Sequence, residues 1–121
     1  SAVLYAQWSG HKPAMLFGAV GVFRKNSAAL STVLKNQITR LALTVMSRKY
    51  RTVTLYGYTA TTGLSSLNAS LSRSRAQNVA NFLRRRLTLL KVKRVTIKSA
   101  GEGAIVGEST AAYSRVEVFG V

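Results

Sequence analysis

The stretch from Gly57 to Leu83 constrains the fold of this chain more than any other. The run that leads into it, 51–58, is rich in β-branched and aromatic residues and predicts a strand, with Val53 and Leu55 facing the core. A short loop of Gly, Thr and Ser then leads into a helix whose apolar residues recur every three or four positions. A strand that feeds directly into an amphipathic helix favours a layered fold in which strands and helices alternate.

Three more segments have the pattern of strands. Residues 16–23 are apolar and predict a buried strand, while 94–99 and 115–121 alternate between two faces. The inward positions of these two are expected to be Val95, Ile97, Val116 and Val118. The sequence Gly101-Glu102-Gly103 is expected to end the third strand as a turn, before a loop at 104–114 with one helical turn.

A helix is expected between the first two strands, over about 28–46. Asn26 or Ser27 can cap its start. Its apolar stripe has helical spacing and consists of Leu30, Leu34, Ile38, Leu41 and Val45. The order strand, helix, strand, helix, strand, loop, strand predicts an α/β (α+β) sandwich of four strands, with two main helices on one face. Residues 1–15 are expected to form an arm or an extra strand beside a domain at 16–121.

The predicted start of the second helix carries an unusual charge. Ser70 or Ser72 can cap it, and Arg73 and Arg75 then lie near the first turn, where the helix dipole favours anions over cations. Arg75 also lies along the apolar stripe. Two interpretations are open. The guanidinium binds a carboxylate or phosphate at this loop–helix junction, or it reaches solvent along its methylene groups.

The balance of charge is extreme. Eighteen Lys and Arg face three acids, all Glu, which gives a formal net charge of +15. Such a field attracts polyanions, namely nucleic acid, anionic lipid surfaces or acidic cell-wall polymers. A basic patch is predicted from Arg84, Arg85, Arg86, Lys91, Lys93, Arg94 and Lys98. The helix dipole explains the three arginines equally well, and no nucleic-acid motif accompanies them, so the sequence disfavours nucleic acid as the partner.

The residue types exclude most catalytic chemistry. The chain has no Cys, no Asp and a single His, His11, so no catalytic residue, no metal site and no cofactor is predicted, and the protein is not expected to be an enzyme. No apolar run is long enough to cross a bilayer. The chain begins at Ser1 without a signal-peptide pattern, so we expect it to be part of a larger protein.

The second helix contains the spacing Asn-x-x-Leu-Ser-x-x-Arg-Ala-x-x-Val-x-x-x-Leu. Every fixed position is met, by Asn68, Leu71, Ser72, Arg75, Ala76, Val79 and Leu83. In this motif the chain resembles the OmpA-like C-terminal domain family, the peptidoglycan-associating module of cell-envelope proteins. The resemblance covers roughly 16–121 and implies a mixed sheet with helices on one side. It also implies a pocket between the loop after the second strand and the start of the second helix.

The resemblance implies a ligand and the residues that bind it. In the family, an arginine contacts the carboxylate of a diamino acid in the peptidoglycan stem, and an aspartate contacts its ammonium group. The arginine corresponds to Arg75, but the family's Gly-x-Thr-Asp ends here in Ala60, so diamino-acid recognition is expected to be altered. The predicted ligand-binding residues are Arg75, Leu71, Asn68, Thr59 and Arg115.

The predicted function is therefore a non-catalytic module that binds peptidoglycan or an anionic wall polymer. It would anchor a larger protein in the extracytoplasmic cell envelope, either the periplasm or the cell-wall space. Two alternatives remain open. One is a degenerate OmpA-like scaffold used for envelope assembly or for homo-oligomerisation. The other is a basic domain that binds polyanions or nucleic acid.

Overall fold

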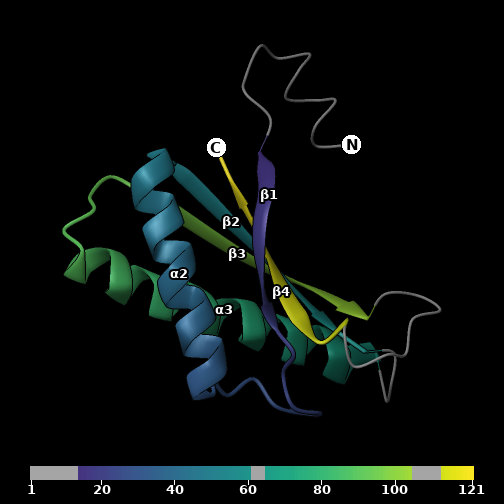
Figure 1. Ribbon diagram of the computed structural model, residues 1–121. Helices are drawn as coiled ribbons and strands as arrows, with labels where there is room; N and C mark the ends of the chain where they lie inside the picture. Colours follow the sequence, from purple (N-terminus) through teal and green to yellow (C-terminus); the bar gives the residue numbers. More distant parts are fainter. Residues whose placement is uncertain (1–13, 61–64, 105–112) are drawn as a thin grey trace, which may run out of the picture.

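The computed structural model describes residues 14–60, 65–104 and 113–121. Its elements follow the predicted order (Figure 1): β1 (Met15–Gly21), α2 (Thr32–Arg48), β2 (Thr52–Thr59), α3 (Ser65–Leu89), β3 (Thr96–Ala104) and β4 (Arg115–Gly120). The predicted fold class is confirmed. The arm expected at 1–15 falls outside these residues apart from its last two positions, as do His11 and most of the loop expected at 104–114.

The four strands form one mixed sheet in the order β1-β4-β2-β3. The central pair, β2 and β4, is antiparallel, with Leu55 opposite Val118. β1 adds antiparallel to β4, and β3 adds parallel to β2, with Val53 opposite Ile97. The parallel pair is joined by α3, because parallel neighbours need a long crossover.

Both helices pack on the same face of the sheet and on each other, and the core lies between these layers. The inward positions predicted on the central strands are fully buried there, including Val53, Leu55, Val116 and Val118. The predicted stripe of the first helix also faces the core, since Leu34, Ile38, Leu41 and Val45 are buried and Leu30 packs against them. The alternation of apolar and polar residues within the strands, and the three- to four-residue spacing of apolar residues in the helix, thus identified the core residues.

Helix α2 starts later than predicted. Its N-cap is Ser31, whose Oγ accepts a hydrogen bond from the backbone N–H of Leu34 at 3.2 Å. Ser27, one of the two predicted caps, instead accepts from the N–H of Ala29 at 3.1 Å in the preceding turn. Several Ser and Thr residues in this segment can accept such a bond, and the sequence alone does not choose among them.

The first strand was predicted to be buried along its length, and this was wrong. β1 ends at Gly21 and lies at the edge of the sheet, and Met15 and Leu16 are 60% and 54% exposed. Val20 of the strand and Phe23 beyond it are buried in the core, and Phe17 packs against the core while only partly buried. An edge strand has one neighbour, so an apolar run there does not imply burial.

The Gly101-Glu102-Gly103 sequence continues β3 rather than ending it. Gly101 lies opposite Gly57 in the register of β2 and β3. A Cβ at Gly57 would lie 2.0 Å from the carbonyl oxygen of Ser72, and one at Gly101 would lie 2.4 Å from the backbone nitrogen of Arg73. The two glycines therefore let α3 approach the sheet closely, which is why they occur within strands.

Candidate functional site

Helix α3 places its motif residues on the side that faces the sheet. The helix begins at Ser65, so the predicted caps Ser70 and Ser72 lie inside it, and that prediction was wrong. The hydroxyl of Ser72 is fully buried; it donates to the carbonyl of Ala69 at 3.0 Å and accepts from the N–H of Gly103 at 2.9 Å. Ser72 thus joins α3 to β3, and this tertiary contact allows helix to extend through a segment rich in cap-forming residues.

Arg75 consequently lies in the interior of α3 and not in its first turn. Its side chain is 1% exposed, so the alternative that it reaches solvent is contradicted. The guanidinium donates to three backbone carbonyls: Nε to Ser27 at 2.8 Å, Nη1 to Tyr58 at 3.0 Å and Nη2 to Arg24 at 3.0 Å. These bonds join α3 to the end of β2 and to the link between β1 and α2.

The charge of Arg75 is buried, and no carboxylate of the described residues pairs with it. In the part of the chain that the structure describes, the one ion pair joins two other residues, Arg115 and Glu117. The ring of Phe23 lies 5.1 Å from the guanidinium carbon of Arg75 and contributes a cation–π contact. Burial lowers the pKa of Arg75 from its usual value, because the charged form loses hydration. A partly compensated cation of this kind favours the approach of an anion.

Three other predicted residues lie on the same helix as Arg75 or directly after its acceptor Tyr58. Leu71 and Asn68 lie one and two turns earlier on α3, where Leu71 is half-buried and Asn68 is buried. Thr59 ends β2, directly after Tyr58, and is 2% exposed. Its Oγ1 is the one buried side-chain polar atom among the described residues that lacks a hydrogen-bond partner. We call Asn68, Leu71, Arg75 and Thr59 the Arg75 site.

Arg115 is not part of this group. It alternates with the inward Val116, so it lies on the face of the sheet opposite the helices. There its Nη2 pairs with Glu117 at 3.1 Å, and its guanidinium carbon lies 4.8 Å from the ring centroid of Tyr113 and 5.6 Å from that of Tyr58. The structure therefore brings four of the five predicted ligand-binding residues together and leaves the fifth on the other face.

Tyr58 connects the two faces at the end of β2. Its carbonyl accepts from Arg75, while its side chain lies among the charged groups of the helix-free face. Burial raises the pKa of the Tyr58 phenol to about 12, with further contributions from the neighbouring Glu117 and Glu102 carboxylates. Sequence reasoning did not predict Tyr58, Arg24 or Ser27 as partners of Arg75, because they contribute backbone carbonyls, which every residue type carries.

A match to a protein-family model identifies the family of this chain. The model of the OmpA family matches residues 22–117, a range that includes all the motif positions of α3. The chain belongs to the OmpA family. A comparison with curated proteins found no match.

Solved structures share the fold of this OmpA-family domain. The OmpA-like domain of FopA1 from Francisella tularensis is 22% identical, with a TM-score of 0.65 over 88% of this chain and 77% of that one. The peptidoglycan-associated lipoprotein from Burkholderia pseudomallei is 23% identical, with a TM-score of 0.64 over 85% and 89%. The C-terminal domain of Helicobacter pylori MotB is 18% identical, with a TM-score of 0.67 over 89% and 83%.

The residues of the predicted basic patch are distributed over α3, the link that follows it and β3. Arg85 and Arg86 both lie over the ring of Phe82, at 5.6 and 5.3 Å from its centroid. Arg84 donates to the side chain of Asn81 at 2.9 Å and to the carbonyl of Ile97 at 3.2 Å. Of the remaining members, Lys91, Lys93 and Arg94 lie in the link between α3 and β3, whereas Lys98 lies on β3 itself.

Other kinds of site were sought within the described ranges 14–60, 65–104 and 113–121. They contain no group of three or more His, Asp or Glu side chains that could hold a metal ion. Nor does any of their helices have the length and apolar character needed to span a membrane.

Proposed function

We propose that this domain is a non-catalytic module that binds peptidoglycan and anchors a larger protein in the extracytoplasmic cell envelope. Membership of the OmpA family and likeness to a peptidoglycan-associated lipoprotein support the class of function. The observation that carries the site is the buried, unpartnered hydroxyl of Thr59 beside a buried cation, Arg75. Leaving a buried hydroxyl unsatisfied costs about 1–3 kcal/mol, which a bound acceptor would remove.

The Arg75 site has the donors that a carboxylate needs. A guanidinium carries five N–H groups, and three of those on Arg75 donate to carbonyls. One N–H on Nη1 and one on Nη2 remain, together with the hydroxyl of Thr59. A carboxylate that accepted from them would also neutralise the buried charge and raise the pKa of Arg75 back toward its usual value.

The replacement of the family aspartate by Ala60 restricts which ligands the site takes. An ammonium group that entered this site would find no carboxylate at position 60. Loss of one partner of a desolvated charge pair costs about 2–5 kcal/mol. We therefore propose that the stem peptide binds through its carboxylate, and that a cross-linked or otherwise neutral amine is preferred to a free ammonium.

A second function is favoured by the same arginine. The three carbonyl bonds of Arg75 join α3, β2 and the link after β1, which is also what a purely structural residue would do. Under this proposal the chain is a degenerate OmpA-like scaffold for envelope assembly or oligomerisation, and its pocket takes no ligand. Oligomers in analytical sedimentation together with a lack of wall binding would support it.

Co-sedimentation with purified peptidoglycan tests the two proposals, with Thr59→Val as the informative variant. Valine has nearly the shape of threonine but no hydroxyl, so the variant should be at least as stable as the parent chain. We expect retention of the parent chain at physiological salt and about fivefold weaker binding of Thr59→Val, the value of one hydrogen bond. Equal retention of the two would show that the Arg75 site is not the binding site, and retention no greater than that of the denatured chain would favour the scaffold.

Recognition of a free ammonium group can be tested by binding of soluble stem peptides. Ala60→Asp restores the carboxylate of the family pattern. We expect it to tighten binding of a stem peptide with a free diamino-acid ammonium by about tenfold or more, and to leave an amine-acylated peptide unchanged. An equal effect on both peptides would contradict the proposed role of position 60.

A further inference from the structure

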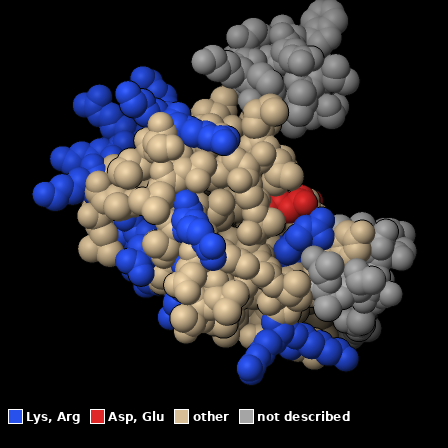
Figure 2. Space-filling model, in the orientation of Figure 1, with Lys and Arg blue, Asp and Glu red and all other residues tan. Residues whose placement is uncertain are grey.

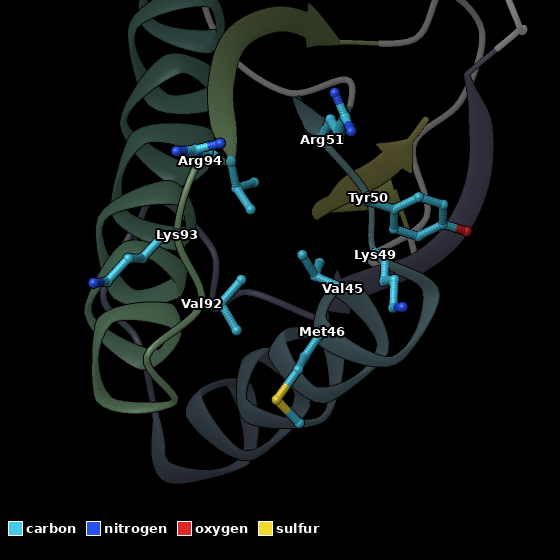
Figure 3. Close-up of a pocket in the computed structure, with 9 residues that line it drawn as sticks. Val45, Met46, Lys49, Tyr50, Arg51, Val92, Lys93 and Arg94 are labelled. Atoms are coloured by element: carbon cyan, nitrogen blue, oxygen red, sulfur yellow. The ribbon is translucent and has the colours of Figure 1, made fainter.

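A concave region lies away from the Arg75 site, where both helices end. It is a cavity of about 300 Å³ between the last turn of α2, the Tyr50-Arg51 link and the connection at 92–95 (Figure 3). Its apolar lining is supplied by Val45, Met46, Tyr50, Val92 and Val95. Its charged lining consists of Lys49, Arg51, Lys93 and Arg94. Figure 3 shows Val45 and Val92 directed into the space, whereas the ammonium end of Lys93 is directed away from it.

A second cavity, of about 490 Å³, adjoins the first and shares Lys49, Tyr50 and Arg51 with it. Tyr50 separates the two and is held firmly, because its ring packs 4.8 Å from that of Phe17 and its hydroxyl accepts from Arg48 at 3.1 Å. The second cavity adds apolar groups that face solvent at the start of β1 and the end of the chain. These are Met15 and Val121, which are 60% and 37% exposed.

We call this region the basic end and define it by the cations Arg48, Lys49, Arg51, Lys93 and Arg94. Among the described residues, no acid lines either cavity. Figure 2 shows a concentration of Lys and Arg side chains at the upper left, where Figure 1 places the last turn of α2 and the link after α3. The acidic atoms visible in that view lie at the right edge of the molecule.

At the basic end, several cations have a backbone conformation that other residue types adopt at a lower free-energy cost. Four non-glycine residues of the described chain have positive φ, and three of them are Lys49, Lys91 and Arg94, with φ of 56°, 59° and 63°. Glycine and asparagine adopt this conformation most readily. Helix dipoles favour cations after α2 and α3, which accounts for Lys49 and Lys91. Arg94 lies beyond both helix ends, so the dipole does not account for it.

We propose that the basic end binds the surface of an anionic phospholipid membrane. Several cations without acidic neighbours match a layer of lipid phosphates, and the exposed Met15, Met46 and Val121 match the carbon atoms just beneath it. This pairing of cations with apolar side chains is the pattern of proteins that bind at the membrane interface. The proposal concerns a different surface from the Arg75 site and does not depend on peptidoglycan binding.

The test is flotation of the full chain with vesicles of phosphatidylcholine and phosphatidylglycerol in equal parts. The variant of the basic end is Lys49→Asn, Arg51→Gln, Lys93→Gln and Arg94→Asn, with asparagine at the two positions of positive φ to preserve folding. The matched control removes the same number of charges from exposed positions elsewhere, namely Lys25→Gln, Lys35→Gln, Arg40→Gln and Lys98→Gln. Circular dichroism checks that both variants are folded.

We expect the parent chain and the control to bind these vesicles at about 0.15 M salt, and the basic-end variant to bind on the order of a hundredfold more weakly. Equal loss in the two variants would show that the net charge, and not this surface, causes binding. Vesicles of phosphatidylcholine alone should bind none of the proteins. Binding of soluble glycerol phosphate as tight as binding of vesicles would replace the membrane by a small phosphate ester and overturn the proposal.

The apolar part of the surface is tested separately with Met46→Gln, which keeps the charge. At high salt we expect this variant to bind vesicles more weakly than the parent chain does. Salt screens the cations but not the apolar contact, so the binding that remains at high salt depends on the apolar side chains. Unchanged binding at high salt would contradict insertion of this side chain. Tighter and salt-resistant binding to DNA than to vesicles would assign the basic end to nucleic acid instead.

Discussion

The Arg75 site and the basic end hold arginine in opposite ways. The Arg75 guanidinium is 1% exposed, donates to three carbonyls and has a lowered pKa. The cations of the basic end line open cavities, and no acid lines these cavities in the part of the chain that the structure describes. A buried cation is fixed by the fold and in turn stabilises it, whereas a solvated cation contributes little to folding and remains available to a partner. Net charge alone does not reveal this difference.

The largest expected effect that would sharpen this comparison comes from Arg75→Ala. The change leaves three part-buried carbonyls without donors and removes a fully buried side chain, so we expect a loss of about 3–5 kcal/mol in the free energy of unfolding, measured by urea denaturation. Arg73→Ala is the matched control, because Arg73 lies two residues earlier on α3 and is exposed. It should cost less than about 0.5 kcal/mol. Similar losses for the two variants would mean that burial does not distinguish them.

Gly57→Ala tests the close contact beside the Arg75 site. The added methyl group would lie 2.0 Å from the backbone oxygen of Ser72, so α3 must move away from the sheet. We expect destabilisation of about 2–3 kcal/mol by thermal unfolding. Gly103→Ala provides the comparison, because no atom lies within 4 Å of its new methyl group and only the positive φ of 71° opposes it. It should cost about 1 kcal/mol, and a larger loss than that of Gly57→Ala would contradict the packing argument.

Substitutions at the basic end should stabilise the fold, in contrast to the loss of stability expected for Arg75→Ala. Lys49→Gly and Arg94→Gly relieve positive φ at residues that make no buried contact with an acid, so each should stabilise the fold by about 0.5–1 kcal/mol. Thermal unfolding measures the gain, and vesicle flotation should show weaker binding of the same variants. A loss of stability would mean that these cations support the fold, as Arg75 does, and the comparison would fail.

The smallest expected effect concerns the titration of Tyr58. A raised pKa means that the folded state holds the phenolic proton more tightly than the unfolded state, whose tyrosines ionise near 10. The corresponding stability is present below pH 10 and is lost as the pH rises toward 12. Ultraviolet titration should show late ionisation of the Tyr58 phenol, and Glu117→Gln should lower the pKa of Tyr58 only modestly, because burial is the larger cause. A pKa near 10 in the parent chain would contradict the burial of this phenol.

Sequence alone predicted the order of elements and most of the core, because both follow from periodicity that survives in the structure. It also identified Arg75 as the residue that needs a partner, but for a reason that was wrong. The cation does not lie in the first turn of α3; it lies within the helix, where backbone carbonyls of Arg24, Ser27 and Tyr58 receive it. Carbonyl partners carry no residue-type signal, so no pattern could have predicted them.

Other predictions from the sequence were wrong because tertiary contacts are not visible in local patterns. Ser72 and Gly101 are typical of helix caps and turns, yet here they let α3 lie against β3, a tertiary contact that overrides local preference. The position of Arg115 could have been predicted, because the alternation that directs Val116 inward also places Arg115 on the opposite face. The same alternation places Glu117 on that face, where it forms an ion pair with Arg115.

The continuity of α3 has a mechanical consequence. About 21 Å of unbroken helix axis separates Arg75 from Leu89, at 1.5 Å per residue, and the helix is packed along β2 and β3. If the wall were held at one end and a membrane at the other, tension between them would run lengthwise along this helix. The domain would then act as a rigid connection that fixes the distance between the wall and the membrane.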